Sequence, residues 1–329
     1  MKYIFTICLF IFLGLDASAQ LDGPRVYWDL PKNLNILSAH VITGNANASV
    51  NNLNFINPSA TIKNNLYMLT YMRSQPILGR TFYSTLFVPT GDITTTIDID
   101  GPGPASSSST LYQHGLGDIM WANTINLIGA PGMGIYDYMR NESPTKVYLQ
   151  AMATFPTGQY DANDPINIGS NQYKLKVGMP IVQRLSPVIN GKRTTLEVFP
   201  SYTFISDNDG LQGQEVEQEG MFILESHLTR DITRKGFLSL DYSYMNGGDA
   251  DFISKETGSV VKTQAGQDVH LIGATVGFSV SDHLNLSLTH NQSFSSGNDI
   301  TSLDGAVTKL TLSWVFHDFQ EQFNNFLGN

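Results

Sequence analysis

The sequence has almost no cysteine, and this absence excludes several classes of chemistry. Its 329 residues contain one cysteine, Cys8. Cys8 lies in an apolar stretch that follows a basic residue and ends at the motif Ala-Ser-Ala at 17–19, the pattern of a secretory signal peptide with its cleavage site. We expect residues 1–19 to be removed on export. The mature chain would then have no thiol, which excludes disulfides, cysteine metal ligands and cysteine nucleophiles.

Long apolar runs and positive charge are also scarce. After the leader, no apolar run approaches the roughly 20 residues that a membrane-spanning helix needs. Charged residues make up 15% of the chain and the net charge is −10. Without a basic stripe to neutralise phosphates, nucleic acid is not an expected partner. An exported chain that is poor in charge and rich in Tyr, Phe, Ser, Asn and Gly indicates a β protein that contacts lipid.

What the sequence does contain is a series of alternating segments. In one of them Tyr173, Leu175 and Val177 share a face, while Lys174 and Lys176 share the other. A period of two is typical of strands, and lengths of about 9–14 residues suit tilted strands that cross a bilayer. Half-buried strands of a soluble sandwich would alternate too. We place the segments at 34–44, 64–73, 80–89, 117–128, 146–155, 172–182, 195–206, 220–229, 236–245, 269–280, 283–294 and 306–317.

The connections between these segments favour a membrane barrel over a sandwich. Long and short connections take turns along the chain, and the long ones carry many acidic residues but only Lys63, Lys255 and Lys262 as basic residues. Short turns on one side and long loops on the other are typical of outer-membrane barrels. We therefore predict an all-β fold, a transmembrane antiparallel up-and-down barrel of about twelve strands. Its expected parts are the signal peptide 1–19, a periplasmic segment 20–33, the barrel 34–317 and a tail 318–329, with a short helix around 135–139.

Several sequence blocks resemble a known family. These are "GPRVYWDLPKNLNIL" at 23–37, "GLGDIMW" at 115–121, "NLIGAP" at 126–131 and "FPTGQYDANDPINIGSNQYKLKVGMP" at 155–180. They are similar, in the same order, to blocks of the outer-membrane family named for the MetA pathway of phenol degradation. In the last block the matching positions are Pro156, Gly158, Tyr160, Asp161, Asn167 and Gly169. The resemblance implies a barrel transporter, with an apolar or aromatic compound as a candidate solute. The tail after the last strand departs from a barrel that stops at its terminal aromatic residue.

Charged side chains on the inner face are the candidate functional residues. An Arg or Lys that faces lipid near the midplane costs about 2–4 kcal/mol, so we expect charges to point into the lumen. Two interpretations stay open: a selectivity ring of mixed sign, or internal ion pairs that brace the barrel. The residues expected to line the lumen are Arg73, Arg80, Asp118, Lys174, Lys176, Glu197, Glu225, Asp241 and Lys309.

Other chemistry finds little support in the sequence. His227 and His290 have serines nearby, but no spacing of nucleophile, base and orienting residue emerges. The acidic run "DANDPIN" offers oxygen ligands without the spacing of an EF-hand. We expect neither an enzyme nor a cofactor nor a resident metal.

Two further expectations concern the later strands. Leu310, Leu312, Trp314 and Phe316 form an apolar face that resembles the terminal signal read by the outer-membrane assembly machinery. If the turn that joins 220–229 to 236–245 centres on Thr233, Glu225 lies opposite Asp241 and His227 opposite Ser239.

These observations predict an outer-membrane channel or transporter for a small solute. The alternative is a non-conducting structural or surface-interaction barrel with cation-binding acidic loops. Expected partners are outer-membrane lipid and lipopolysaccharide, the assembly machinery and the solute. The expected location is the bacterial outer membrane.

Overall fold

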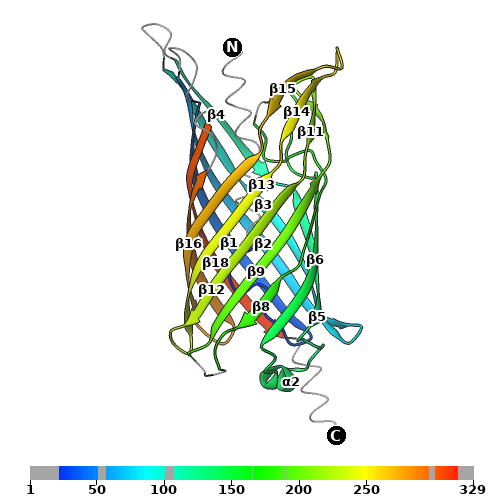
Figure 1. Ribbon diagram of the computed structural model, residues 1–329, viewed down its shortest axis with the longest axis vertical. Coiled ribbons are helices and arrows are strands. Elements are labelled where there is room, and N and C mark those ends of the chain that lie inside the picture. The colour runs from blue at the N-terminus through cyan, green and yellow to red at the C-terminus, as the bar shows by residue number, and fades with distance from the viewer. Residues whose placement is uncertain are drawn as a thin grey trace.

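The computed structural model describes residues 22–50, 57–100, 107–164, 166–187, 189, 191–295 and 301–317. These residues form a closed antiparallel β-barrel of twelve wall strands (Figure 1). Ten wall positions are single strands: β1 (Leu34–Val50), β2 (Asn57–Ile77), β3 (Arg80–Asp100), β6 (Thr145–Phe155), β9 (Thr194–Ile205), β12 (Met221–Asp231), β13 (Gly236–Gly247), β16 (Gln267–Ser279), β17 (Leu284–Ser295) and β18 (Thr301–His317). Each of the other two is a pair of shorter strands, β4 (Ser107–Leu116) with β5 (Ile119–Ile128), and β7 (Lys174–Gly178) with β8 (Ile181–Arg184).

The barrel closes between its first and last strands. β1 pairs with β18 from Leu34↔His317 to Val50↔Thr301, and its other edge pairs with β2. A closed sheet is the arrangement expected for strands in a bilayer, because hydrocarbon offers no hydrogen-bond partner to an unpaired backbone N–H or C=O at a sheet edge. The predicted all-β barrel and its twelve wall positions are therefore confirmed.

Burial along much of the barrel wall is inverted relative to a soluble protein. On β12 the alternate residues Glu225, His227 and Thr229 are buried, whereas Phe222 and Leu228 are exposed. Polar groups inside and apolar groups outside is the pattern expected where the outer face meets lipid.

Two wall strands are interrupted for different reasons. β7 and β8 keep one register against β9, since Gly178↔Ser201 and Ile181↔Val198 belong to the same ladder. Pro180 has no N–H to contribute and interrupts the hydrogen-bond pattern. β4 and β5 are instead separated by a shift of one residue at 117–118.

The two ends of the barrel differ. At the long-loop end, the upper end in Figure 1, a second sheet has the order β10 (Asn208–Leu211), β11 (Gln214–Gln218), β14 (Ala250–Ser254) and β15 (Val260–Gln264). Sequence alternation did not predict these four short strands, which lie in segments expected to be loops.

At the opposite, short-turn end lies the helix α2 (Ile135–Arg140), which includes the positions expected to be helical (Figure 1). Within the described ranges, no helix is long and apolar enough to span a membrane.

The predicted register of β12 and β13 is wrong by two residues. The ladder pairs Leu228 with Leu240 and places Asp241, not Ser239, opposite His227. The turn is centred one residue later than Thr233, with the N–H groups of both Ile232 and Thr233 directed at the carbonyl of Gly236. A shift of two residues leaves every side chain on its predicted face, which is why the facing pattern could not reveal it.

Candidate functional site

The N-terminal segment, residues 22–33, lies inside the barrel. This corrects the expectation that 20–33 is a periplasmic segment, for the part that the structure describes. Tyr27 is 1% exposed and packs in an inner cluster with Tyr83, Tyr148 and Phe199, with a ring-centroid distance of 4.9 Å to Phe199. Burial of this aromatic ring favours the seated segment, because large aromatic side chains contribute much of the energy of a packed interface.

The upper part of the segment is held by an ionic cluster. Asp22 N–H donates to Glu225 Oε2 at 3.0 Å, and the Asp22 carboxylate accepts the hydroxyl of Tyr27. Lys176 Nζ lies 3.5 Å from Glu225 Oε1 and 3.7 Å from Asp22 Oδ2, while Lys309 Nζ donates to the Asp22 carbonyl at 3.1 Å. Two lysines of the wall therefore compensate two carboxylates, of which that of Glu225 is fully buried and that of Asp22 is partly exposed.

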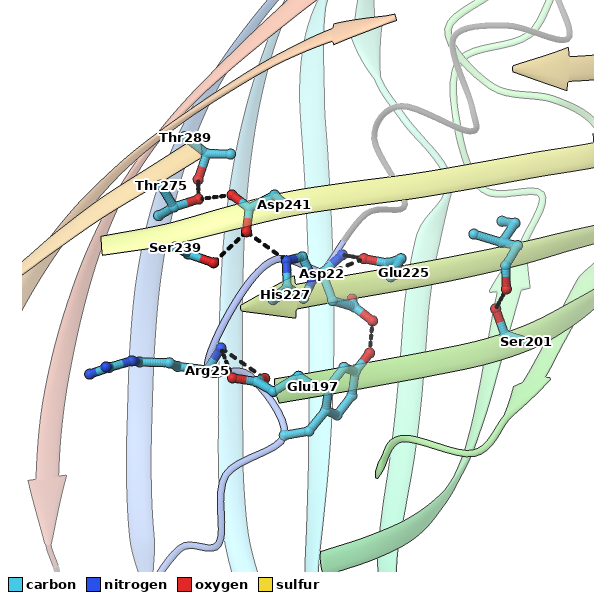
Figure 2. A network of polar contacts seen from close by, with 12 residues as sticks. Asp22, Arg25, Glu197, Ser201, Glu225, His227, Ser239, Asp241, Thr275 and Thr289 are labelled. Atoms are coloured by element: carbon cyan, nitrogen blue, oxygen red, sulfur yellow. Dashed lines mark hydrogen bonds and ion pairs between the residues drawn. The ribbon is translucent and has the colours of Figure 1, made fainter. Parts of the chain in front are cut away.

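A chain of polar contacts continues from this cluster along the wall, and Figure 2 shows it from close by. His227 Nδ1 is 2.8 Å from Asp241 Oδ1, which also accepts the Ser239 hydroxyl at 2.6 Å. Thr275 donates to Asp241 Oδ2 at 2.5 Å and contacts the Thr289 hydroxyl at 2.8 Å. The carboxylate stands between the serine and the histidine, so this order of groups does not let the histidine activate the serine.

A second cluster holds the middle of the segment. The Arg25 N–H donates to both carboxylate oxygens of Glu197, at 3.1 and 3.0 Å, and Trp28 Nε1 donates to Glu197 Oε1 at 2.9 Å (Figure 2 shows the Arg25 contacts). The Arg25 guanidinium pairs with Asp231. The guanidinium of Arg193 lies 3.8 Å from the centroid of the Trp28 ring, and that of Arg25 lies 4.4 Å from it.

The segment is fastened at the short-turn end as well. Lys146 Nζ lies 2.5 Å from Asp29 Oδ1, and Asn141 Nδ2 donates to Asp29 Oδ2 at 3.0 Å. The Ser74 hydroxyl bonds the Pro31 carbonyl, and the Leu34 N–H donates to Ser74 Oγ at 3.0 Å. Residues 22–33 are thus attached to the wall at three levels.

The structure places most of the expected lumen residues on the inner face. Lys176, Glu197 and Glu225 are almost fully buried, and with Lys309 they contact the N-terminal segment. Asp241 belongs to the adjoining polar chain, and Lys174 is buried on the same face as Lys176. These side chains hold a segment in place, so they do not form an open ring.

Arg73 and Arg80 are placed differently from the prediction. Both are exposed, and their positions in the pleat are those of the outer face, since the alternate residues Ser74 and Thr81 are the buried ones. They lie near the short-turn ends of β2 and β3, where a long cationic side chain can reach the membrane interface without entering hydrocarbon. Inward placement of charge is therefore a sound expectation for the midplane and a poor one for strand ends.

Asp118 organises a loop. Its carboxylate accepts the N–H of Gly158 at 2.8 Å, and both the N–H and the hydroxyl of Ser170, at 2.8 and 2.7 Å. Gly158 and Gly169 are in backbone contact, so a Cβ on Gly158 would meet Gly169 Cα at 2.7 Å. The strand break at 117–118 thus anchors the long loop that contains the "FPTGQYDANDPINIG" block.

Apolar side chains point into the barrel toward the long-loop end, where they pack in two buried clusters. One cluster of inward-facing residues joins Met221, Ile223, Met245, Val269 and Leu271 on β12, β13 and β16. Another cluster joins Met120, Ala122 and Met152, with Met68 and Phe87 packed against it, on β2, β3, β5 and β6. Sequence alternation could not reveal these patches. It used apolar residues to identify the lipid-facing side of each strand, so it gave no signal for apolar residues that face inward.

No metal site is evident in the described ranges. No group of three or more His, Cys, Asp or Glu side chains there is placed to hold a metal ion. His290 is exposed on the outer face and contacts Thr308, so it lies on the opposite side of the wall from His227.

Sequence reasoning missed Asp22, Arg25 and Trp28 as functional residues. The available signal was a block rich in aromatic and charged residues directly before the first strand, within the family-like stretch 23–37.

Comparison with known proteins agrees with this architecture. An outer-membrane channel of Pseudomonas putida F1, described as a COG4313 channel, is 16% identical, with 89% of this chain and 99% of that chain covered and a TM-score of 0.68. The transport unit of the Escherichia coli autotransporter AIDA-I is 9% identical over 91% and 94% of the two chains, with a TM-score of 0.49. A FadL homologue of Pseudomonas aeruginosa is 8% identical over 86% and 90%, with a TM-score of 0.45. The P. putida structure supports the fold, and the other two are too distant to add to it.

No curated protein matches the sequence. A family model described as "Putative MetA-pathway of phenol degradation" matches residues 42–305, which is most of the chain. On that match, the chain belongs to the family named for the MetA pathway of phenol degradation.

Proposed function

We propose that this protein is an outer-membrane channel for a small apolar or aromatic solute. The observation that carries the proposal is the pair of apolar, methionine-rich patches on the inner face of a closed barrel. A channel for ions or sugars needs a polar wall, whereas flexible, polarisable methionine side chains suit apolar guests of varied shape. The P. putida protein, itself described as an outer-membrane channel, supports the general function, and the family description supports the aromatic class.

In this proposal the N-terminal segment keeps the resting channel narrow. It contacts the wall below the apolar patches through Glu225, Lys176 and Glu197. The attachment is non-covalent, so the segment can in principle be displaced without breaking the barrel. We assign the inner charges to holding this segment and not to selecting ions.

The seated segment also favours a second candidate, a non-conducting structural barrel. The segment occupies the lumen at three levels, by contacts at Asp22, Arg25 and Asp29, so passage of a solute would need an additional step in which the segment moves. The two candidates differ in whether that step occurs.

Solute flux distinguishes them. Purified protein in liposomes should accelerate uptake of a radiolabelled monoaromatic alcohol, while uptake of a disaccharide should stay at the rate of empty vesicles. Substitution of Met221 and Met245 by Gln would make one patch polar and should reduce aromatic uptake. Absence of aromatic flux, together with absence of conductance in planar bilayers, would favour the structural barrel.

The remaining assignments belong to the same proposal. We propose export through a cleaved signal peptide, lipid and lipopolysaccharide around the outer face, and recognition of the last strand by the assembly machinery. Leu310, Leu312 and Trp314 are exposed on that face, and the Trp314 and Phe316 rings lie 4.9 Å apart. The Ser239–Asp241–His227 geometry gives no support to an enzymatic role.

A further inference from the structure

A cavity at the short-turn end is separate from the apolar patches of the lumen. It has a volume of about 170 Å³ and lies between α2, β6, β8, β9 and the N-terminal segment. Cavities of about 150 Å³ in other proteins accept benzene, so this one has room for a single aromatic ring. Its walls combine the aromatic rings of Trp28 and Tyr138 with the cationic side chains of Lys146, Arg184 and Arg193.

The charges around this cavity do not balance. Lys146 is compensated by Asp29, the one acidic side chain of the lining. Arg184 Nη2 donates to the carbonyl of Glu142 at 2.6 Å, and in the described part of the chain no carboxylate lies within ion-pair distance of Arg184. The cavity therefore carries an excess of positive charge.

Arg193 has unused hydrogen-bonding capacity. It shares Asp231 with Arg25, and its Nε, 3.5 Å from Asp231 Oδ2, is buried without a hydrogen-bond partner among the described residues. Its guanidinium lies over the Trp28 ring, 3.8 Å from the centroid, and this contact limits its movement. A guanidinium fixed in this way is suited to a planar anion, since its N–H groups match the two oxygens of a carboxylate.

Tyr138 adds a neutral donor. Burial, with the nearby Asp29 carboxylate, raises the pKa of Tyr138 to about 12. Its hydroxyl therefore stays protonated under ordinary conditions and can donate a hydrogen bond to an anion.

From the size, the charge excess and the aromatic lining, we propose that this cavity binds a small aromatic carboxylate. The carboxylate would lie between Arg184 and Arg193, with its ring against Tyr138 and the edge of Trp28, because the Trp28 ring already carries the Arg193 and Arg25 guanidinium groups. This site goes beyond the proposed channel function, because it selects an anion at the mouth, whereas the apolar patches would take a neutral solute.

Ligand-observed NMR on the full chain in detergent tests the proposal, with benzoate as the probe. Benzyl alcohol has a similar shape without the charge, and acetate has the charge without the ring. Benzoate should bind saturably and roughly tenfold or more tightly than either, because benzyl alcohol lacks the charge that hydrogen-bonds the arginines and acetate lacks the apolar ring that is buried in the cavity. Equal binding of benzyl alcohol would overturn the anion assignment, and equal binding of acetate or phosphate would overturn the aromatic one.

Variants identify the site. Arg184→Gln should weaken benzoate binding roughly tenfold, and Arg193→Gln should do so as well. Arg140→Gln removes an exposed arginine of α2 that does not line the cavity, and it should leave binding unchanged. Heat-modifiable migration on SDS gels checks that each variant is folded. If folded Arg184→Gln binds benzoate as tightly as Arg140→Gln, the proposed site is wrong, whatever the flux measurements show.

Discussion

Lys176 is the side chain on which seating of the N-terminal segment depends most directly. It is 1% exposed and lies within 3.7 Å of carboxylate oxygens on both Asp22 and Glu225, and its Nζ is 4.7 Å from the centroid of the Phe199 ring. Lys176→Met keeps much of the length and apolar stem but removes the charge. Two carboxylates then face each other in a buried space with one lysine fewer to compensate them.

The magnitude follows from which group is able to leave. Removal of one partner from a buried ion pair costs about 3–5 kcal/mol. Glu225 belongs to the ladder of β12 and has no way out, whereas Asp22 belongs to a segment without strand pairing. Most of this free-energy cost should therefore destabilise the state in which residues 22–33 are seated in the lumen, relative to the unseated state. Since 1.4 kcal/mol is a factor of ten, about 3 kcal/mol raises the unseated population roughly 100-fold.

A single engineered cysteine measures that population. Val26 packs against the inner cluster around Tyr27, and Cys8 is the chain's one natural cysteine, so Val26→Cys in a Cys8→Ser background gives a unique thiol. With Lys176 intact, a bulky maleimide should react slowly. With Lys176→Met, labelling should accelerate roughly 100-fold if opening is fast relative to reaction, because the rate then follows the open population.

Two variants control for other causes. Lys235→Met removes an exposed lysine in the turn between β12 and β13, and it should leave labelling slow. Adding Glu225→Gln to Lys176→Met removes the uncompensated charge while keeping an oxygen for the Asp22 N–H, and it should restore slow labelling. If Lys176→Met labels no faster than Lys235→Met, or if Glu225→Gln brings no recovery, the ionic cluster does not hold the segment.

Three further predictions concern assembly, loop structure and pH. Trp314→Ala with Phe316→Ala should lower the amount of barrel in outer-membrane fractions, whereas deletion of 320–329 should be tolerated; a harmful deletion would mean that the assembly signal lies in the tail. Gly158→Ala should destabilise the folded conformation of its loop by about 1–3 kcal/mol, because the new Cβ has no space beside Gly169. Limited proteolysis should then cut this loop faster while the barrel stays intact. Burial lowers the pKa of Lys262 to about 8, so acetylation followed by mass spectrometry should reach half its maximal rate near pH 8 in folded protein and near the ordinary pKa of 10.5 in urea. Because the unfolded chain binds the proton more tightly, the long-loop sheet should gain stability as the pH rises from about 8 to 10.5. Identical acetylation profiles in folded and unfolded protein would contradict the burial of Lys262.

The sequence by itself determined the wall of the barrel. Alternation placed Lys176 and Glu225 on one face and Leu175 and Leu228 on the other, and the structure has the same division. This works because a membrane strand has one apolar and one polar neighbourhood, so a local period of two is sufficient to assign each face. The rule failed at Arg73, since a strand end at the interface allows charge on either face.

Tertiary structure alone decided the content of the lumen. The contact between Asp22 and Glu225 joins residues 203 positions apart, and that between Arg25 and Glu197 joins residues 172 apart. Nothing in the local pattern of either partner encodes such a pairing. The register that joins His227 to Asp241 is likewise invisible to a period of two, because a shift by two residues preserves every face. Local periodicity therefore fixes which side of the wall each residue occupies, and only long-range packing fixes which residues meet there.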